Sequence, residues 1–533
     1  MKNENGISTG LKGAARVASG EAVAVEKSKI KEIVERKKAR PRKRGYVAAG
    51  QSGEQSLWRG SAGDANYDIQ TGLEKLRAKS RDAYQNEAYA HDIIDTYVDL
   101  LISTGIKPTP DTGDDRLNDR VWALWQKWAK NPVAGSPIDF YGFERLLARH
   151  IVMDGEGMTR FRVRRLDDMP GVPPLKLQPI EADLLPISKI EILSNGSRII
   201  SGVEFDKIGE IAAYHLLKEH PGSSMLLGAR GSTTETTRVP AENIIHAFDP
   251  VRSGQVRGVP WLSPILLTIK NFHDLLYAVQ VAVHAIGTLA FIVEGGDSSD
   301  PIPGINPVIE NGDVLHDADG SVVEEMVPGL VAYTPDGKKV TITTPQMPTG
   351  MKELVSTYLH EIAAAIGLSY HTVSGDMSDA SFSQAKLGLI RESVHLACLR
   401  ELMLIPMALD PIYRRFIRES INYGFLPDDP RLYGVRWTSP RIPSADEESE
   451  TRTAILKMQA GLDSRPRIIE AGGLDPDTVT AAIAADKKQV TELGLVLLGD
   501  LDRVTTQGMK QMDTSDSSDS QTSDDSDRKT DSI

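Results

Sequence analysis

The sequence is poor in cysteine, in long apolar runs and in the short motifs that mark many enzymes. Its 533 residues include one cysteine, Cys398, which excludes an internal disulfide and a zinc site built from cysteines. Cys398 lies within an apolar helical pattern, so we expect it to be a small buried core residue.

No uninterrupted apolar run is long enough to cross a membrane. The most apolar stretch, LLYAVQVAVHAIGTLAFIVE at 275–294, is interrupted by Gln280, His284 and Glu294. It falls short of the ~18 uninterrupted apolar residues that indicate a span, so it predicts a buried helix. The first 20 residues also lack a long apolar block, and we expect no secretory signal.

Motifs for nucleotide hydrolysis and metal binding are missing. The sequence has no G-x-x-x-x-G-K-[ST] segment, which excludes an ATP-hydrolysing P-loop, and no H-E-x-x-H zinc motif. HDADGSVVEE at 316–325 places Gly320 two residues too early for an EF-hand. We therefore expect no cofactor and no metal, although a Mg²⁺ held by carboxylates alone would escape this search.

One pair of residues has catalytic spacing. Ser383 and Lys386 form an S-x-x-K pattern, which can place a hydroxyl one helical turn from an amine, but the S-D-N and K-T-G elements of such enzymes are absent. Ser381 and Gln384 instead form a capping-box pattern. This pattern predicts that Ser383 lies in the first turn of a structural helix. Since the sequence shows no other recognisable active site, we expect that the chain is not an enzyme.

Charge is distributed unevenly. The net charge of −13 argues against a protein that simply grips nucleic acid through phosphate contacts. A basic run at 26–44 lies in a predicted disordered arm, 1–55, and an Asp/Ser-rich segment ends a predicted acidic disordered tail, 501–533. The basic arm is either a solvated segment or a contact for nucleic acid or an acidic partner.

Between these arms the pattern alternates between helical and strand periods, which predicts a large soluble α+β core. Tryptophans spaced by three in 118–130 indicate a helix that faces the core. The remaining expected elements are a helix ending at Gly155, a strand at 158–166, a hairpin at 202–217, a strand at 242–250, a long helix capped by Ser263, a hairpin at 328–345, a helix at 351–367 stopped by Gly367, and a helical tract from 382 to about 422 broken at Pro406 and Pro411.

Three ordered stretches resemble the lambda-type portal proteins of tailed phages. They are the "H-x-F-x-P-x-R-x-G-Q-x-R-G" loop and following helix within 239–278, the "GLSY" turn and Asp/Ser loop within 362–392, and the "PRIP" entry and "AGL-x-(S/T)-R" turn within 437–479. One departure is Phe382-Ser-Gln-Ala-Lys386, where the family often has Y-S-S-A-R. This weakens any role tied to that arginine.

The resemblance implies a non-enzymatic portal fold with wing, stem, clip and crown regions, assembled in the host cytoplasm as a ring of about twelve copies. The ring would occupy one capsid vertex of the virion. Double-stranded DNA would enter through it, driven by a terminase large subunit, and leave by the same channel. Further implied partners are head-completion, connector and tail proteins, the major capsid protein and the scaffold protein, with no membrane.

By the same analogy the chain divides into seven parts. These are the basic disordered arm 1–55, the N-terminal wing and first stem helix 56–160, the β-rich clip region 161–250, the second stem helix 251–290, the wing hairpin, tunnel loop and long helices 291–430, the C-terminal crown region 431–500, and the acidic disordered tail 501–533.

The segment TTPQMPTGMK at 343–352 is the candidate tunnel loop, because its two prolines and glycine forbid regular structure between a hairpin and a helix. An ordinary surface connection is the alternative. The candidate channel residues are Thr344, Pro345, Gln346, Met347, Pro348, Thr349, Gly350 and Lys352.

Two competing functions are a capsid-assembly hydrolase that uses Ser383 and Lys386, and a monomeric nucleic-acid-binding protein that uses its basic arm. A ring with a central hole would distinguish the portal from both, since either rival predicts a small particle.

Overall fold

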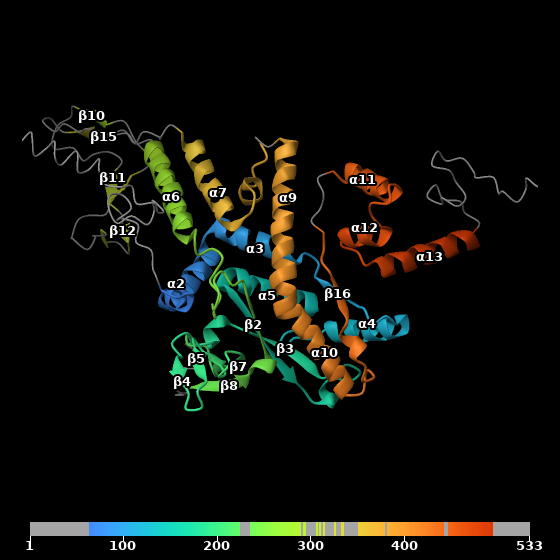
Figure 1. The fold of residues 1–533 in the computed structure, drawn as a ribbon. Helices are drawn as coiled ribbons and strands as arrows, with labels where there is room; N and C mark the ends of the chain where they lie inside the picture. Colours follow the sequence, from blue (N-terminus) through green and yellow to red (C-terminus); the bar gives the residue numbers. More distant parts are fainter. Residues whose placement is uncertain are drawn as a thin grey trace, which may run out of the picture. The chain divides into compact units, whose positions relative to one another are not determined.

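The computed structural model describes residues 63–223, 235–288, 350–378, 381–441 and 446–493, together with short strands between 292 and 334 (Figure 1). The predicted arms 1–55 and 501–533 lie outside the described residues, as do Thr344 to Thr349 of the candidate tunnel loop. The described residues from Asp64 onward belong to one compact unit.

Four helices build the N-terminal part of this unit. Each has a recognisable start: Asp64, Asp114 and Asp139 accept N–H groups at the first turns of α2, α4 and α5, while α3 follows α2 directly after Glu87. Their bounds are α2 Ala65–Asn86, α3 Ala88–Ile102, α4 Asp115–Ala129 and α5 Phe140–Asp154.

Two antiparallel sheets follow α5. The first has the order β3-β2-β9 and the second the order β4-β5-β6-β7-β8. Strand β2 is central to the first sheet because it pairs with both β3 and β9. The bounds are β2 Glu156–Val163, β3 Leu175–Ile180, β4 Glu191–Ile192, β5 Arg198–Ile200, β6 Val203–Phe205, β7 Ile211–Leu217, β8 Thr236–Pro240 and β9 Ile244–Phe248.

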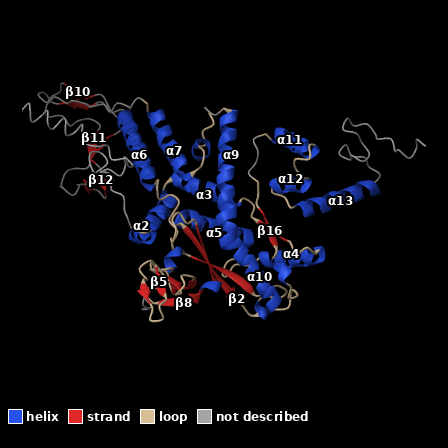
Figure 2. Cartoon of the chain, viewed as in Figure 1, coloured by secondary structure: helices blue, strands red, loops and turns tan. Residues whose placement is uncertain are grey.

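Alternation along β2 places its side chains in two different environments. Phe161 faces the main core, which contains the buried residues of α3, α4 and α5, whereas Met158 faces a smaller core shared with the five-stranded sheet. Figures 1 and 2 show helices α3 and α5 over the three-stranded sheet. Trp125 and Trp128 of α4 are fully buried in the main core, which confirms the predicted tryptophan stripe.

The C-terminal half is mostly helical. A two-stranded antiparallel pair, β1 (Lys107–Pro110) with β16 (Val435–Thr438), ties it to the N-terminal part. The helices are α6 Leu266–Thr288, α7 Met351–Ile366, α8 Tyr370–Ser374, α9 Phe382–Leu399, α10 Asp410–Asn422, α11 Glu447–Gln459, α12 Arg465–Ala471 and α13 Pro476–Glu492. The short strands are β10 Ile292–Glu294, β11 Ile305–Pro307, β12 Ile309–Glu310, β13 Asp313–Val314, β14 Glu324–Met326 and β15 Ala332–Thr334.

Most of the expected elements are confirmed. Helix α5 ends at Gly155, helix α7 ends at Gly367, and the predicted hairpin is β6 paired with β7. The hairpin expected at 328–345 lies largely outside the described residues. Within the described ranges, no helix combines the length and the apolarity needed to cross a membrane.

Two details of the helices differ from expectation. Helix α6 begins at Leu266, not beside Ser263, because the preceding residues are held in turns by short-range bonds such as Ile265 N–H to Leu262 C=O. The long tract does run from 382 to 422, but neither Pro406 nor Pro411 breaks it, since α10 follows the preceding segment directly at Asp410. Residues Arg400–Leu409 widen into a π-helical segment, which accommodates the missing N–H of proline.

Two expectations about burial were wrong. Cys398 is exposed on α9, and residues 276–284 of α6, expected to be buried, include the exposed side chains of Leu276, Tyr277, Val281 and Val283. In both places the apolar residues recur at helical spacing as expected, but no other part of the described chain packs over these side chains.

A buried carboxyl group in α5 makes stability depend on pH. Glu144 is fully buried and accepts the N–H of Ile106 at 2.8 Å, and no cation contacts it among the described residues. Burial raises the pKa of Glu144 well above its usual range, although the Ile106 bond acts in the opposite direction.

We predict that Glu144→Gln removes part of this dependence. The raised pKa means that Glu144 contributes stability fully below the unfolded value of about 4.3, and that this is lost as pH rises toward the folded value. The free energy of unfolding of the wild type should fall relative to Glu144→Gln by up to about 1.4 kcal/mol per pH unit above pH ~4.3. Urea unfolding across pH 4 to 8 measures it, with exposed Glu74→Gln as control. Parallel wild-type and Glu144→Gln curves would contradict it.

Candidate functional site

A buried ion network joins the first sheet to the loop that follows β9. Glu156, the first residue of β2, is fully buried and is contacted by two arginines and a histidine. Arg77 of α2 donates Nη2–H to Glu156 Oε1 at 2.5 Å, Arg257 donates Nε–H at 3.0 Å to the same oxygen, and His246 of β9 lies 3.0 Å from Oε2.

Arg257 is the centre of this network. Besides Glu156, its guanidinium donates to the carbonyl oxygens of Leu185, Ser201 and Ala182 at 2.8 to 3.1 Å. It therefore ties β2 to the segments before and within the five-stranded sheet. Burial alone would raise the pKa of Glu156, but Arg257, Arg77 and His246 outweigh it and hold the pKa well below its usual range.

Two glycines let the backbone approach this network. Gly258 N–H donates to Glu156 Oε2 at 2.9 Å, and a Cβ on Gly258 would lie 2.0 Å from the carbonyl oxygen of Gly155. A Cβ on Gly155, which has φ +89°, would equally collide with the backbone of Val259. The R-G pair of the loop is thus required by close packing, a structural role that the sequence pattern did not reveal.

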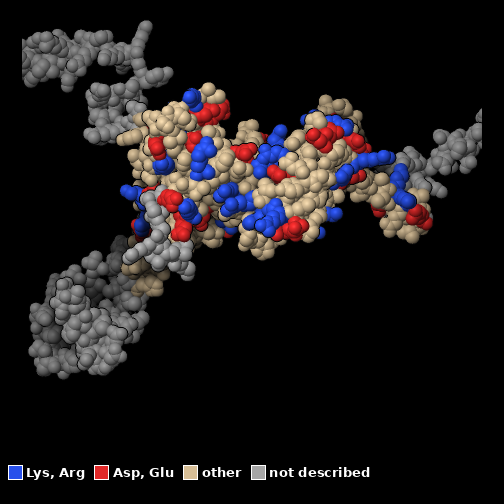
Figure 3. Space-filling view, turned by 90° about the horizontal axis from the view of Figure 1, so that it is seen from below, with Lys and Arg blue, Asp and Glu red and all other residues tan. Residues whose placement is uncertain are grey.

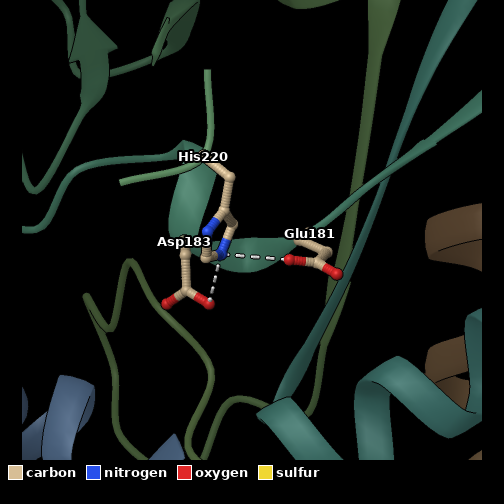
Figure 4. Close-up of side chains that lie close together, drawn as sticks. All are labelled: Glu181, Asp183 and His220. Carbon is tan, nitrogen blue, oxygen red and sulfur yellow. Dashed lines mark hydrogen bonds and ion pairs between the residues drawn. The ribbon is translucent and has the colours of Figure 1, made fainter. Parts of the chain in front are cut away.

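A second cluster lies next to the network. Figure 4 shows His220 between Glu181 and Asp183, with Nε2 at 3.1 Å from Glu181 Oε2 and 3.5 Å from Asp183 Oδ2. This is the one group of side chains, within the described residues, whose donor atoms lie close enough to share a metal ion.

The hydrogen bonds of this cluster favour a neutral histidine that is hydrogen-bonded to the carboxylates over a metal site. His220 Nδ1 accepts the N–H of Gly222 at 3.0 Å, so Nε2 carries a proton and points it at the carboxylates. Burial alone would raise the pKa of Asp183, but the effects of Arg81, Arg77 and His220 are larger and lower this pKa below its usual value. The nitrogen that would bind a metal is therefore protonated, and Asp183 is already neutralised by arginine.

An apolar helix face lies open on α9. Its exposed side chains include Leu387, Ile390, Val394 and Leu402, which are 52 to 75 % exposed, although the last belongs to the π-helical segment. Exposed helix faces in soluble proteins are normally polar. We call this surface the outer face of α9, formed by Leu387, Ile390, Val394, Ala397, Cys398 and Leu402.

A cleft of about 530 Å³ adjoins this face. It lies between α9, the end of α7 and the loop 249–264, and Trp261, Ala365 and His395 are among its lining residues. The exposed end of α6, formed by Leu276, Tyr277, Val281 and Val283, is a second apolar surface on a different element.

The predicted capping box is confirmed. Ser381 Oγ accepts the N–H of Gln384, and the side-chain oxygen of Gln384 accepts the N–H of Ser381. Ser383 is exposed in the first turn of α9, as expected. Of the candidate channel residues, Gly350 precedes α7 with φ +91° and Lys352 lies in its first turn. The other six lie outside the described residues, so their predicted role is untested.

The buried charges thus connect the two sheets, and the described part of the chain exposes apolar side chains on two helices. The model of the phage portal protein family of the lambda type matches residues 51–400, so the chain belongs to that family. The membership predicted from the sequence is confirmed.

Individual relatives are similar along most of the chain. The probable portal protein of Halomonas phage phiHAP-1 is 27% identical over 471 residues, covering 85% of this chain and 88% of the relative. The neck of a native gene transfer agent particle is a similar solved structure, with a TM-score of 0.39, 12% identity and coverage of 76% of this chain and 94% of that one. An HK97-family portal protein from Corynebacterium diphtheriae has a TM-score of 0.27 at 9% identity, covering 65% and 90%.

Proposed function

We propose that the chain assembles into a closed ring of about twelve copies at one capsid vertex, around a channel for double-stranded DNA. DNA would enter during packaging and leave during ejection. A terminase, head-completion and tail proteins, and the capsid and scaffold proteins would dock on the ring. Family membership supports this role, and the outer face of α9 is the observation that carries the assembly step.

Two separate apolar surfaces suit a ring better than a simple dimer. A ring needs a heterologous contact, in which each copy offers one surface to one neighbour and a different surface to the other. The outer face of α9 with its cleft, and the exposed end of α6, are two such surfaces on one chain. We infer that at least the α9 face is covered by a neighbouring copy.

Imaging and native mass of the purified chain test the proposal. We expect a ring with a central hole wide enough for duplex DNA. Cys398, the one thiol in the sequence, reports on the α9 face directly. It should react slowly with a maleimide in rings and quickly in dissociated chains. A monomer that stays small at high protein concentration would overturn the proposal.

We also predict that Ser383→Ala and Lys386→Ala assemble rings and package DNA as the wild type does, because the capping box gives this stretch a structural role. Nuclease-protected DNA in filled heads and ring formation measure this. A hydrolytic activity that the wild type has and either variant lacks would contradict the prediction.

The proposed tunnel loop gives a separate prediction. If the loop 344–349 projects into the channel, inserting four Gly/Ser residues into it should narrow the channel. The end of the loop is fixed, because Gly350 directly precedes α7 and Lys352 lies in its first turn. Rings should form while packaged DNA falls severalfold. The same insertion at Gly209, in the exposed β6–β7 turn, is the control. Normal packaging with the lengthened loop would place this segment away from the DNA path.

A further inference from the structure

The underside of the three-stranded sheet carries basic side chains without acidic partners. Arg160 and Arg162 point to the same side of β2, and Lys176 of β3 pairs with Arg162 across the strands. Arg164 follows β2 at the next position of the same alternation. We call these four residues the basic sheet face.

No carboxylate pairs with any of the four among the described residues. Arg162 donates to the amide oxygen of Gln178 at 2.7 Å, and Lys176 Nζ donates to Asn131 Oδ1 at 2.9 Å. The pKa of Arg160 is lowered mainly by burial and also by the positive charge of Arg162. The pKa of Lys176 is lowered mainly by burial and also by the positive charge of Arg164. The four cations therefore repel one another in a chain whose net charge is −13.

The basic sheet face also lies next to a pocket. A pocket of about 360 Å³ opens beside it, lined by Arg164, Lys176 and the Gly135-Ser136 turn. Figure 3 shows groups of Lys and Arg on the side of the molecule where both sheets lie. Guanidinium groups held by a sheet and by amide partners are well placed to bind carboxylates, which they contact bidentately.

We propose that the basic sheet face binds the Asp-rich C-terminal segment of this protein, residues 513–533, from the same or a neighbouring copy. That segment contains seven aspartates against Arg528 and Lys529. Charge complementarity favours it over duplex DNA, because a chain of net charge −13 repels DNA at a distance. The C-terminal segment is tethered to the chain, so its high effective concentration near the basic sheet face favours binding despite this repulsion.

The length of the chain permits this contact. About 20 residues separate Leu493, where the described part ends, from Asp513. Such a linker spans at most about 66 Å when extended and roughly 25 Å as a flexible coil. A unit of this size has a radius of gyration of only about 22 Å. The inference does not depend on ring formation.

A labelled peptide of residues 513–533 tests the proposal by fluorescence anisotropy against the chain that lacks those residues. We expect salt-sensitive binding that Arg162→Glu with Arg164→Glu weakens about tenfold or more. Arg116→Glu with Lys79→Glu, an equal charge change at exposed residues of α4 and α2, should leave it unchanged. The intact chain should bind the peptide more weakly, since its own segment competes.

Three outcomes would overturn the proposal. The peptide fails to bind, it binds both double variants equally, or its Asp→Asn form binds as well as the native form. A labelled 20-base-pair duplex is measured in parallel, and duplex binding lost only in Arg162→Glu with Arg164→Glu, without peptide binding, would assign the face to DNA. Deletion of 513–533 should leave ring assembly intact, so a failed ring assay and a failed peptide assay remain distinguishable.

Discussion

Replacing Glu156 with glutamine is expected to destabilise the chain by about 3–5 kcal/mol, the cost of removing one partner from a buried ion pair. Glu156 is fully buried, and its charge offsets those of Arg77 and Arg257. The substitution keeps the shape of the side chain but leaves Arg257 buried without a carboxylate and Arg77 with only Asp183, 3.7 Å away. The measurement is the free energy of unfolding from urea titration at pH 7.

A matched control separates burial from pairing. Asp99→Asn removes the carboxylate of a half-exposed ion pair with Arg145 on α5, and should cost less than about 1 kcal/mol. Arg257→Lys keeps a positive charge near Glu156 but loses the fork of donors that reaches Leu185 and Ala182, so its cost should lie between these two. Equal losses for Glu156→Gln and Asp99→Asn would show that the network does not stabilise the fold.

The effect of pH on this network has a definite sign. Because the pKa of Glu156 is held below its usual range in the folded chain, its contribution to stability is fully present above about pH 4.3. The contribution is lost as pH falls through the folded value. Glu144, whose pKa is raised, acts in the opposite sense over a higher range of pH. Glu156 therefore makes the chain less stable as pH falls below about 4.3, and Glu144 makes it less stable as pH rises above that value.

Local signals in the sequence were sufficient for most helices and strands. The cap at Ser381, the stop at Gly155 and the tryptophan stripe of α4 each depend on neighbouring residues alone. The ion network could not be predicted in this way, because Arg77, Glu156 and Arg257 are far apart in the sequence. Only the fold brings them within hydrogen-bond distance.

The two wrong predictions of burial have a common cause. Apolar periodicity indicates that a helix face avoids water, and it does not say which molecule covers that face. Cys398 on α9 and Tyr277 on α6 follow buried patterns yet are exposed in the single chain. A neighbouring copy would reconcile pattern and structure. The failed predictions therefore mark the same surfaces that we propose for assembly.

Introducing a charge on the outer face of α9 is expected to abolish ring assembly. Val394 is 61 % exposed, so Val394→Asp should change the stability of the isolated chain by no more than about 0.5–1 kcal/mol, the range for exposed helix positions. In a ring the same aspartate would be buried against apolar neighbours at every contact, and each contact would lose several kcal/mol. Negative-stain images and native mass should show single chains, with an unchanged circular dichroism spectrum.

A matched substitution tests whether this loss belongs to the α9 face. Ile208, in the turn between β6 and β7, is 85 % exposed, and Ile208→Asp makes the same change from an apolar to an acidic side chain away from α9. It should still form rings in which Cys398 is protected from maleimide, whereas Cys398 of Val394→Asp should react quickly. Rings of normal size from Val394→Asp, with a reactive Cys398, would show that the α9 face is not the surface between copies. Because both variants carry the same added charge, a general effect of charge on assembly would appear in both and a local contact in only one.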